Sequence, residues 1–469
     1  MLRIDAHSMA AVTGGELLCG APDSVVSDIV IDSRHVSPGC AFVALMGERS
    51  DGHEFCSTAL ELGARALIVS KETESLGVVI DRACEHESVI VRVADGVRAL
   101  QDLAAYHRSR LKCEVVGITG STGKTTTKDF VRSALGNSMR VVCTEGNRNN
   151  ELGVPLTVLR ASMDTDVLIV EMGMRGEGEI AALCEIARPS LGLITNVGTS
   201  HIELLGSQDA VARAKGELVR CLPSGGRAFL NGDDAYTDLI AEWSDAPVVR
   251  WGLSGSCEVS ATDVKVDGEG RPDFTLVAPQ GSVRIQLPVP GRHNVYNALA
   301  AAAIALYLCV PIDEICTGLA AAELSAMRMQ VFESASGITV INDAYNANPV
   351  SMRAAIEALS DMQTSGQRVA VLGDMAELGS LTEVAHFRIG EQVARLPIDA
   401  LVTVGPRAER IAQGARAEGM LASRVRACAE APEAVEVLDD LLAAGDVVLV
   451  KASRVMGLEA IAEGIVNPR

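Results

Sequence analysis

The feature that most constrains the fold is a glycine-rich segment, GITGSTGKTT, at residues 117–126. A β-branched run over 114–119 leads into it, and a helical pattern over 124–135 follows it. A strand, a glycine loop and a helix in this order form a phosphate-binding loop, in which backbone N–H groups and the positive end of the helix face phosphate oxygens. Such loops belong to parallel sheets, so the sequence predicts an α/β fold around this segment.

Two side chains of this loop have the chemistry that a bound nucleoside triphosphate requires. Lys124 is expected to neutralise the β- and γ-phosphates, and the Thr125 hydroxyl is expected to ligate Mg²⁺. Ile118 stands where the strict pattern GxxxxGK[ST] has its first glycine, so a glycine- and threonine-rich turn without a ligand is the alternative. The loop alone does not indicate which reaction follows. The residues expected to hold ATP are Gly120, Ser121, Thr122, Gly123, Lys124, Thr125 and Thr126.

Patterns on either side of the loop divide the chain into three α/β domains. Residues 1–110 alternate short apolar runs with helical patterns and predict a small α/β domain. Residues 111–322 contain four-residue apolar runs that suit strands buried on both faces, so we expect a mostly parallel sheet with helices on both faces. Within it, an antiparallel excursion is expected over 247–290 and a long helix over 293–308. Residues 323–469 predict a Rossmann-like doubly wound sheet.

Polar residues follow two of the central apolar runs. Glu171 comes directly after the run 167–170, at the strand end that faces the ligand crevice, where it would bind Mg²⁺, position a phosphate or cap the next helix. His201 comes shortly after the run 191–195 and would ligate a metal or donate to a phosphate, although a lone histidine is more often structural. Lys215 lies in a helical stretch, and its spacing alone predicts a surface lysine.

Charge and cysteine content exclude other classes of protein. The formal net charge of −20 repels nucleic acid and anionic lipid, so an anionic ligand must be held by a local cluster of donors. The twelve cysteines form no CxxC pair and predict reduced side chains rather than a zinc site or a disulfide framework. Residues 1–15 do not resemble a signal peptide, and the longest apolar run, 298–310, is shorter than the ~20 residues of a membrane helix. We expect a cytoplasmic protein that binds no nucleic acid and does not insert into a membrane.

Further motifs, spread over essentially the whole chain, resemble those of the Mur ligases, which are ATP-dependent amide ligases of peptidoglycan synthesis. In chain order they are DSR at 32–34, GERSDGHEF at 47–55, GNRNNELGVP at 146–155, GRHNVYNALAA at 291–301, NDAYNANPVSM at 342–352, LGDMAELG at 372–379 and KASR at 451–454. The YNANPVSM and LGDMAELG strings are most similar to the branch of the family that adds D-alanyl-D-alanine. The phosphate loop is shared by the wider superfamily.

The resemblance implies a catalytic set that spacing alone does not give. Lys215 matches the family lysine that CO₂ converts into an anionic, metal-binding carbamate. Glu171 and His201 match positions that hold Mg²⁺ together with this group and Thr125. Arg328 matches an arginine that reaches the ATP phosphates from the third domain. The implied catalytic residues are Lys124, Glu171, His201, Lys215 and Arg328.

The resemblance also places the ligands on the chain. Asn294 and Asn297 match the adenine side of the ATP site, and Asp343 matches the ribose side. A UDP-N-acetylmuramoyl (UDP-MurNAc) tripeptide is implied for the N-terminal domain, and its peptide for the asparagine-rich loop at 147–150. D-Alanyl-D-alanine is expected at the strand ends of the C-terminal domain. The residues expected to contact these substrates are Ser33, Arg34, Gly47, Arg49, His53, Asn147, Asn149, Asn150, Asn346, Asn348, Asp374 and Lys451.

The implied reaction is an ATP-dependent amide ligation. Phosphorylation of the tripeptide carboxylate gives an acyl phosphate, and the amine of D-alanyl-D-alanine then attacks the acyl carbon. Domain closure would shield the acyl phosphate from water, and the enzyme is expected to be a monomer. The alternatives are a sister ligase that adds a single amino acid, a folylpolyglutamate-type ligase, and a P-loop ATP switch that consumes no amine.

Three positions depart from the family pattern. Met327 precedes Arg328 where glycine is usual, Asn342 stands where many members have a second acid, and Ala452 replaces a glycine. Each change lies beside a retained functional residue.

Overall fold

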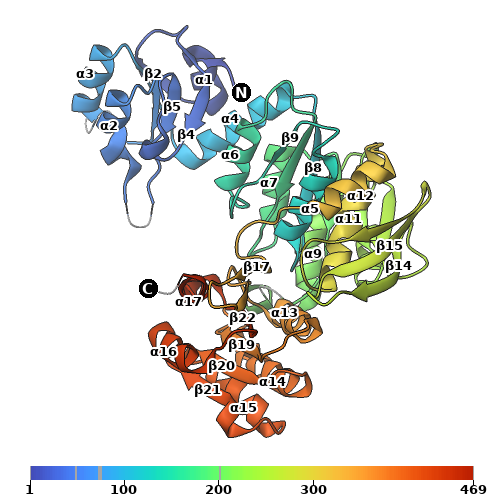
Figure 1. Cartoon of the computed structure of the whole chain (residues 1–469). Coiled ribbons are helices and arrows are strands. Elements are labelled where there is room, and N and C mark those ends of the chain that lie inside the picture. The colour runs from blue at the N-terminus through green and yellow to red at the C-terminus, as the bar shows by residue number, and fades with distance from the viewer. Residues whose placement is uncertain (1, 48–49, 72–75, 200–201, 468–469) are drawn as a thin grey trace.

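The computed structural model of the chain describes residues 2–47, 50–71, 76–199 and 202–467 (Figure 1). Their main sheets follow one another along the chain. A five-stranded sheet lies within residues 16–92, a nine-stranded sheet within 114–286 and a six-stranded sheet within 330–451. Three α/β units are therefore confirmed, whereas the boundaries near residues 110 and 322 stay predictions.

The N-terminal domain consists of β1 (Ile4–Asp5), α1 (Ala6–Thr13), β2 (Glu16–Cys19), β3 (Val25–Val26), β4 (Asp28–Val30), η1 (Ser33–His35), β5 (Cys40–Val43), η2 (Gly52–Phe55), α2 (Cys56–Glu61), β6 (Ala66–Val69), α3 (Gly77–Glu85), β7 (Val89–Arg92) and α4 (Gly96–Arg110). Its sheet has the order β2-β7-β6-β5-β4, and β2 runs antiparallel to β7. Alternate residues of β5 and β6 pack against α2 and α3 on one face and against α1 and α4 on the other.

The central domain consists of β8 (Glu114–Thr119), α5 (Lys124–Leu135), β9 (Val141–Cys143), α6 (Gly153–Leu159), β10 (Val167–Glu171), α7 (Glu179–Ala187), β11 (Leu191–Ile194), α8 (Ile202–Leu205), α9 (Gln208–Arg220), β12 (Arg227–Asn231), α10 (Thr237–Ala241), β13 (Val248–Gly252), β14 (Val259–Val266), β15 (Pro272–Ala278), β16 (Gly281–Gln286), α11 (His293–Tyr307) and α12 (Ile312–Ala320). The sheet order is β16-β15-β14-β13-β12-β11-β8-β10-β9. Helices α5, α11 and α12 cover one face, and α4, α6, α7 and α9 cover the other, as expected.

The antiparallel excursion begins later than the sequence suggested. Strand β13 pairs in parallel with both β12 and β14, and only the β14-β15-β16 meander is antiparallel. The prediction of antiparallel structure from residue 247 is therefore wrong for β13. The residues of a strand determine which of its faces is buried, and those of β13 do not indicate the direction of its neighbours.

The C-terminal domain consists of β17 (Gln330–Glu333), β18 (Thr339–Asn342), α13 (Pro349–Asp361), β19 (Arg368–Gly373), η4 (Gly379–Leu381), α14 (Thr382–Arg395), β20 (Ala400–Val404), α15 (Glu409–Ala417), η5 (Ala422–Arg424), β21 (Val425–Cys428), α16 (Ala431–Leu441), β22 (Val447–Lys451), η6 (Arg454–Met456) and α17 (Glu459–Val466). Its sheet has the order β17-β18-β22-β19-β20-β21 and is parallel except for the edge strand β17. Helices α13, α14 and α15 pack on one face and α16 and α17 on the other, so the doubly wound fold is confirmed.

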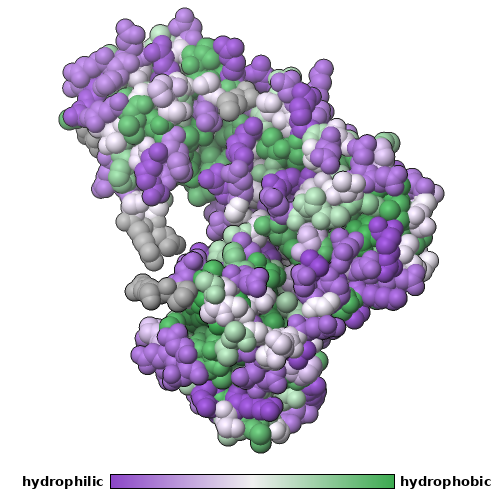
Figure 2. Space-filling model, viewed as in Figure 1, coloured by the Kyte–Doolittle hydropathy of each residue, from purple (hydrophilic) through white to green (hydrophobic). Residues whose placement is uncertain are grey.

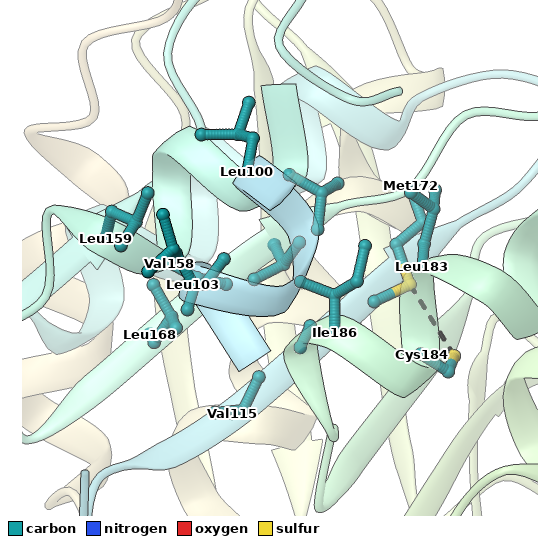
Figure 3. Packing of buried hydrophobic residues seen from close by; sticks show 14 of the residues in the cluster. Leu100, Leu103, Val115, Val158, Leu159, Leu168, Met172, Leu183, Cys184 and Ile186 are labelled. Carbon is teal, nitrogen blue, oxygen red and sulfur yellow. Dashed lines mark hydrogen bonds between the residues drawn. The ribbon is translucent and has the colours of Figure 1, made fainter. Parts of the chain in front are cut away.

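Helix α4 connects the N-terminal and central domains through a continuous apolar cluster. Its Leu100 and Leu103 are fully buried beside Val158 and Leu159 of α6 and Ile186 of α7 (Figure 3). The same cluster continues into the N-terminal sheet. Burying each large aliphatic side chain contributes about 1.5–3 kcal/mol, so α4 fixes the N-terminal domain on one face of the central sheet.

The surface of the molecule is mostly hydrophilic, and an open hollow separates the N-terminal and C-terminal domains in the view of Figure 2. No helix within the described ranges is long and apolar enough to cross a membrane. All twelve cysteines are free, which agrees with the expected absence of a disulfide framework.

Candidate active site

The phosphate loop joins β8 to α5 at the carboxyl edge of the central sheet. Gly120 and Gly123 have φ angles of +148° and +79°, in the region that favours glycine. A Cβ atom on Gly120 would lie 1.8 Å from Thr195 Oγ1, and one on Gly123 would lie 2.6 Å from Asn297 Oδ1. Ile118 is a fully buried residue within β8. The turn therefore begins at Gly120, and the departure from the strict motif lies inside the strand.

The chain after β11 holds the phosphate loop in shape. The Thr122 N–H donates to Asn196 Oδ1 at 3.0 Å, and the Ser121 N–H donates to the Asn196 carbonyl at 3.0 Å. Thr195 Oγ1 donates to the Thr122 carbonyl at 2.6 Å. Because β11 is the parallel neighbour of β8, these residues reach the loop from the same edge of the sheet. The loop is therefore preorganised by protein contacts alone.

Charges of both signs meet at this loop. Lys124 Nζ donates to the Gly120 carbonyl at 2.7 Å. Burial lowers the pKa of Lys124, the Glu171 carboxylate raises it, and the Arg328 guanidinium lowers it. Two cations beside one carboxylate form a local positive cluster in a strongly acidic protein, which is the arrangement that an anionic ligand needs.

Glu171 ends β10 with one carboxylate oxygen unused. Its Oε1 accepts from Asn149 Nδ2 at 2.8 Å, and its backbone N–H donates to Thr144 Oγ1 at 2.9 Å. The other oxygen, Oε2, is buried and has no hydrogen-bond partner in the part of the chain that the structure describes. A buried carboxylate oxygen without a partner indicates a ligand that is bound in the working enzyme.

Lys215 lies in α9 and is 1% exposed, so the surface position expected from its spacing alone is wrong. Burial, and secondly the charge of Lys124, bring the pKa of Lys215 well below its usual value. This lowered pKa favours the neutral amine, which is the nucleophilic form of lysine.

These oxygen donors fit Mg²⁺. The Thr125 hydroxyl and Glu171 Oε2 are hard ligands of the kind that Mg²⁺ prefers, and Mg²⁺ in nucleotide sites is completed by phosphate oxygens and water. Among the residues with described positions, no three His, Cys, Asp or Glu side chains form a metal-binding group. His201, the remaining residue of the expected metal set, lies outside the described residues.

Arg328 reaches this edge from the segment that joins α12 to β17. Its guanidinium donates to Thr125 Oγ1 at 3.2 Å and lies 4.0 Å from the centre of the Tyr345 ring. The flanking Met327 and Met329 have φ angles of +58° and +50°. Positive φ is unfavourable for a side chain of this size, which explains why glycine suits position 327 and why methionine there carries backbone strain.

Asn294 and Asn297 lie on α11 behind the phosphate loop. Asn297 Nδ2 donates to Asn294 Oδ1 at 3.0 Å, and Asn297 Oδ1 accepts from Thr127 Oγ1 at 3.1 Å. Asn294 Nδ2 donates to the Pro290 carbonyl at 2.8 Å. Both asparagines are buried, and their place beside Gly123 supports the loop. Their expected contact with adenine stays a prediction.

Family models match the chain in three consecutive stretches. They are the Mur ligase family catalytic domain over residues 25–108, the Mur ligase middle domain over 118–305 and the Mur ligase glutamate ligase domain over 327–454. A curated relative from Mycobacterium tuberculosis, UDP-N-acetylmuramoyl-tripeptide–D-alanyl-D-alanine ligase, is 38% identical over 99% of this chain and 98% of its own length. The chain belongs to the Mur ligase family.

Solved structures of the family superpose on this ligase along its whole length. MurF from Acinetobacter baumannii has a TM-score of 0.88 at 32% identity and covers 99% of both chains. MurF from Thermotoga maritima, solved in complex with ADP, has a TM-score of 0.80 at 29% identity and covers 93% of this chain and 96% of its own. A nucleotide product in that relative agrees with the phosphate loop found here.

In the C-terminal domain of the ligase, the expected ligand-binding residues contact one another. Lys451 Nζ lies 2.6 Å from Asp343 Oδ2 and donates to the Asn346 carbonyl at 2.9 Å. Asp343 Oδ1 accepts from the Met329 N–H at 3.1 Å. Lys451 is 2% exposed, and its ammonium group is bonded to these neighbours. Direct contacts of Asp343 with ribose and of Lys451 with the dipeptide stay predictions.

Asp374 and Asn348 stabilise the starts of helices. Asp374 Oδ1 accepts from the N–H groups of Arg407 and Ala408 at 3.0 and 2.7 Å, just before α15. Asn348 Oδ1 accepts from the Ser351 N–H at 2.9 Å and caps α13. Asn346 is exposed and remains accessible to a ligand.

The two remaining departures from the family pattern are accommodated locally. Ala452 is fully buried, and a Cβ on Gly373 would lie 2.7 Å from its methyl group, so the glycine at 373 makes room for the alanine. Asn342 Oδ1 accepts from the Ala344 N–H at 3.1 Å and thus shapes the turn after β18.

In the N-terminal domain, the expected nucleotide-binding residues lie around η1 and the loop before η2. Arg34 forms an ion pair with Asp32 at 2.6 Å, and its side chain is 84% exposed. His53 is buried, with Nδ1 2.6 Å from Asp51 Oδ1 and Nε2 accepting from the Ser70 N–H at 3.0 Å. Ser33 lies in η1, and the Gly47 N–H donates to the Ser50 carbonyl at 3.0 Å. Arg49 lies outside the described residues.

The asparagine-rich loop lies between β9 and α6. Asn149 contacts Glu171, and Asn150 Oδ1 accepts from the N–H of Gly153, the first residue of α6, at 3.0 Å. The Asn147 carbonyl accepts from the Asn149 N–H at 2.8 Å. Asn149 is therefore the member of this loop that the fold brings to the carboxyl edge beside the metal-binding candidates.

Sequence reasoning missed Thr195, Asn196 and Tyr345, which shape the loop and support Arg328. Thr195 and Asn196 directly follow a buried apolar run, which is the signal that also identified Glu171. Tyr345 lies inside the YNANP string, but the sequence does not predict its contact with Arg328, because that contact joins two separate segments.

Proposed function

We propose that this ligase joins D-alanyl-D-alanine to UDP-MurNAc-tripeptide, with ATP converted to ADP and phosphate, and so forms the UDP-MurNAc-pentapeptide used in peptidoglycan synthesis. The observation that carries this assignment is the similarity, over nearly the whole chain, to curated ligases with that printed activity. The loop, the carboxylate and the arginine described above are the parts that the ATP-dependent step requires.

The first step transfers the γ-phosphoryl group of ATP to the terminal carboxylate of the tripeptide. Lys124 and Arg328 offset the negative charge of the phosphates, since catalysis of this transfer depends mostly on positioning and charge neutralisation. Thr125 and Glu171 would hold Mg²⁺, which would supply positive charge to stabilise the transferring phosphoryl group. The Asn149 side chain, bonded to Glu171, orients the carboxylate ligand.

The second step needs no protein nucleophile. The amine of the dipeptide attacks the acyl carbon, the C–O bond to phosphate breaks, and phosphate leaves as the amide forms. The dipeptide approaches from the C-terminal domain, where Asn346, Asn348, Asp374 and Lys451 surround the strand ends. The uridine nucleotide lies on the N-terminal domain at Ser33, Arg34, Gly47, Arg49 and His53, and Asn147, Asn149 and Asn150 face its peptide.

Lys215 carries a carbamate in the working enzyme. A neutral lysine amine adds to CO₂ and releases one proton, and the resulting anion supplies oxygen ligands for Mg²⁺. The burial of Lys215, its lowered pKa and the neighbouring Lys124 charge favour this modification. A ¹³C-NMR carbamate signal from the ligase in ¹³C-bicarbonate, absent from Lys215→Arg, is the expected result. Equal spectra from both proteins would refute it.

The three domains close around the substrates. The hollow between the N-terminal and C-terminal domains gives them room to approach, and closure would exclude water from the acyl phosphate (Figure 2). We expect small-angle scattering to show a smaller radius of gyration with an ATP analogue and UDP-MurNAc-tripeptide. An unchanged radius would oppose closure.

The decisive experiment measures phosphate release from ATP with UDP-MurNAc-tripeptide, with and without D-alanyl-D-alanine. Release that depends on both substrates, with a pentapeptide product by mass spectrometry, is the expected result. Turnover with a single amino acid in place of the dipeptide would assign the protein to a sister activity. Release that is indifferent to either substrate would favour a nucleotide switch.

The ligase acts as a monomer in the cytoplasm, where ATP and nucleotide-linked precursors are available. Its free cysteines suit a reducing compartment. Sedimentation at micromolar concentration tests the oligomeric state, and a dimer under these conditions would contradict it.

A further inference from the structure

One face of the phosphate-loop helix α5 is bonded to the segment that carries Arg328. Thr125, Asp129 and Arg132 lie four and then three residues apart, so their side chains share one side of the helix. Thr125 Oγ1 accepts from Arg328 at 3.2 Å, Asp129 Oδ2 accepts from the Ser325 N–H at 2.7 Å, and Arg132 donates to the Glu323 carbonyl at 3.2 Å.

These contacts run in opposite order along the two segments. As the helix proceeds from 125 to 132, its partners recede from 328 to 323. The connecting segment therefore lies antiparallel to α5 over its first two turns. The way in which residues 323–328 pair with α5 therefore determines which side chain of the segment lies at the phosphate loop.

The middle contact is made by a buried ion pair. Lys128 Nζ lies 3.0 Å from Asp129 Oδ1, and both side chains are 3% exposed. Lys128 also donates to the Thr144 carbonyl at 2.9 Å. A buried ion pair stabilises a fold little compared with apolar residues of the same volume. Its effect here is to fix the positions of the segments that it contacts.

The Lys128–Asp129 pair is also connected to Glu171, the candidate metal ligand, through Thr144. Thr144 Oγ1 accepts from the Glu171 N–H at 2.9 Å, and the Thr144 carbonyl accepts from Lys128. One carboxylate and one ammonium thus tie the segment that carries Arg328 and the strand end that carries Glu171 to a single helix.

We propose that Asp129, charge-balanced by Lys128, is a positioning residue for the phosphoryl-transfer step, because it sets the register that places the Arg328 guanidinium at the phosphate loop. The inference rests on the proposed function. Arg328 needs such support because Met327 and Met329 beside it have strained backbones, and a loop in that state can relax to other conformations. Misplacement of a reacting or stabilising group by about 1 Å costs on the order of 100-fold in rate.

The test compares Asp129→Asn and Asp129→Ala in the full-length ligase. Asn keeps an oxygen that can accept from Ser325, whereas Ala does not. We expect Asp129→Ala to lower kcat on the order of 10- to 100-fold, with the KM for each substrate nearly unchanged, and Asp129→Asn to retain more of the rate. Arg132 is exposed, on the same side of α5 as Thr125 and Asp129. Arg132→Ala should lower kcat by about twofold, since a surface contact contributes little.

Two controls separate positioning from general loss of stability. Asp446 is also a buried carboxylate that accepts from backbone N–H groups, those of Gln367 and Ala443, but it precedes β22 at the opposite edge of the C-terminal sheet. Asp446→Asn should lower the thermal midpoint and leave kcat within twofold. In an Arg328→Ala background, Asp129→Ala should cause no further loss of kcat.

A folded Asp129→Ala with full kcat, or an equal loss from Asp129→Ala with and without the Arg328→Ala substitution, would overturn the proposal. If Asp129→Ala does not fold, Asp129→Asn in the two backgrounds still decides it, because a loss of kcat that persists in the Arg328→Ala background would overturn the proposal. The proposed function fails separately, because the unsubstituted ligase would then form no pentapeptide at all.

Discussion

Buried charged groups are satisfied to different degrees in the central and C-terminal domains. At the carboxyl edge of the central sheet, Glu171 Oε2 and Arg328 Nε are buried without a partner among the described positions, and burial lowers the pKa of Lys215. At the corresponding edge of the C-terminal sheet, Asp343 and Lys451 satisfy one another. Both edges are formed by the carboxyl ends of parallel strands, so the direction of the strands does not explain the difference.

An unsatisfied buried group costs about 1–3 kcal/mol, and a bound ligand that supplies the missing partner removes this cost. A satisfied pair needs no ligand and contributes to the structure instead. We infer that the central edge is built for ATP and Mg²⁺, and that the buried C-terminal pair supports the surface that the dipeptide approaches. Substitutions should therefore change activity at the first edge and stability at the second.

Arg328→Ala should give the largest effect. An arginine that stabilises the transferring phosphoryl group is worth about 10³-fold or more in kcat, or at least about 4 kcal/mol. Stability should change little, because removing a buried Nε that has no partner in the described structure offsets the loss of the contacts with Thr125 and Tyr345. Steady-state phosphate release and thermal unfolding measure the two effects. A lower midpoint of thermal unfolding, with kcat within tenfold of that of the unsubstituted ligase, would show that Arg328 mainly stabilises the fold.

Lys451→Met should give the next largest effect, on stability. Removing one partner of a buried ion pair costs about 3–5 kcal/mol, because the Asp343 charge is left uncompensated. Chemical unfolding measures the loss, and the matched double variant Lys451→Met/Asp343→Asn should recover most of it. Normal stability with a raised KM for D-alanyl-D-alanine would instead support the direct substrate contact predicted from the sequence.

Glu171→Gln should lower kcat by about 100-fold, or about 2.7 kcal/mol, and raise the Mg²⁺ concentration needed for half-maximal rate. The amide keeps an oxygen for Asn149 and loses the negative charge at the metal. Titration of Mg²⁺ during phosphate release tests this, with Glu179→Gln on the exposed start of α7 as the control. An unchanged Mg²⁺ requirement would place the metal elsewhere.

Much of the fold follows from local patterns, because strands buried on both faces are uniformly apolar and their helices are amphipathic. The run at 114–119, the helix at 124–135 and the run at 447–451 coincide with β8, α5 and β22. Strand direction at the sheet edge was missed, since the residues of β13 do not indicate the direction of the strands with which it pairs.

The site was predictable only where it depends on local structure. Glu171 was found because it ends a buried strand, whereas Lys215 appeared as a surface residue until the resemblance to the family assigned its role. The contact between Asp129 and Ser325 joins residues far apart in sequence, and Asp129 looks from its spacing like any acid on a helix. Long-range hydrogen bonds to backbone groups leave no periodic trace, so positioning residues of this kind need the structure.

Substitution of His293 should give the smallest effect, a change in how stability depends on pH. His293 belongs to α11 of the central domain, and the charges of Asp343 and Lys451 in the C-terminal domain act on it. Burial lowers its pKa to about 4, with Asp343 raising and Lys451 lowering it. The folded pKa lies below the ordinary value of 6.5, so the unfolded chain binds more protons between these values. The stabilisation is thus fully present above pH 6.5 and is lost as the pH falls toward 4, with a slope of at most about 1.4 kcal/mol per pH unit.

Urea unfolding across that range should therefore show a shallower pH dependence for His293→Asn than for the unsubstituted ligase. Carboxylates that titrate in the same range contribute equally to both proteins and cancel in the difference. Parallel curves would show that His293 takes up its proton equally in both states. A residue that only stabilises the contact between the central and C-terminal domains should leave the kcat of the folded enzyme unchanged. If His293→Asn keeps the pH dependence of stability but lowers kcat at pH 8, His293 instead contributes to the active site at the central edge.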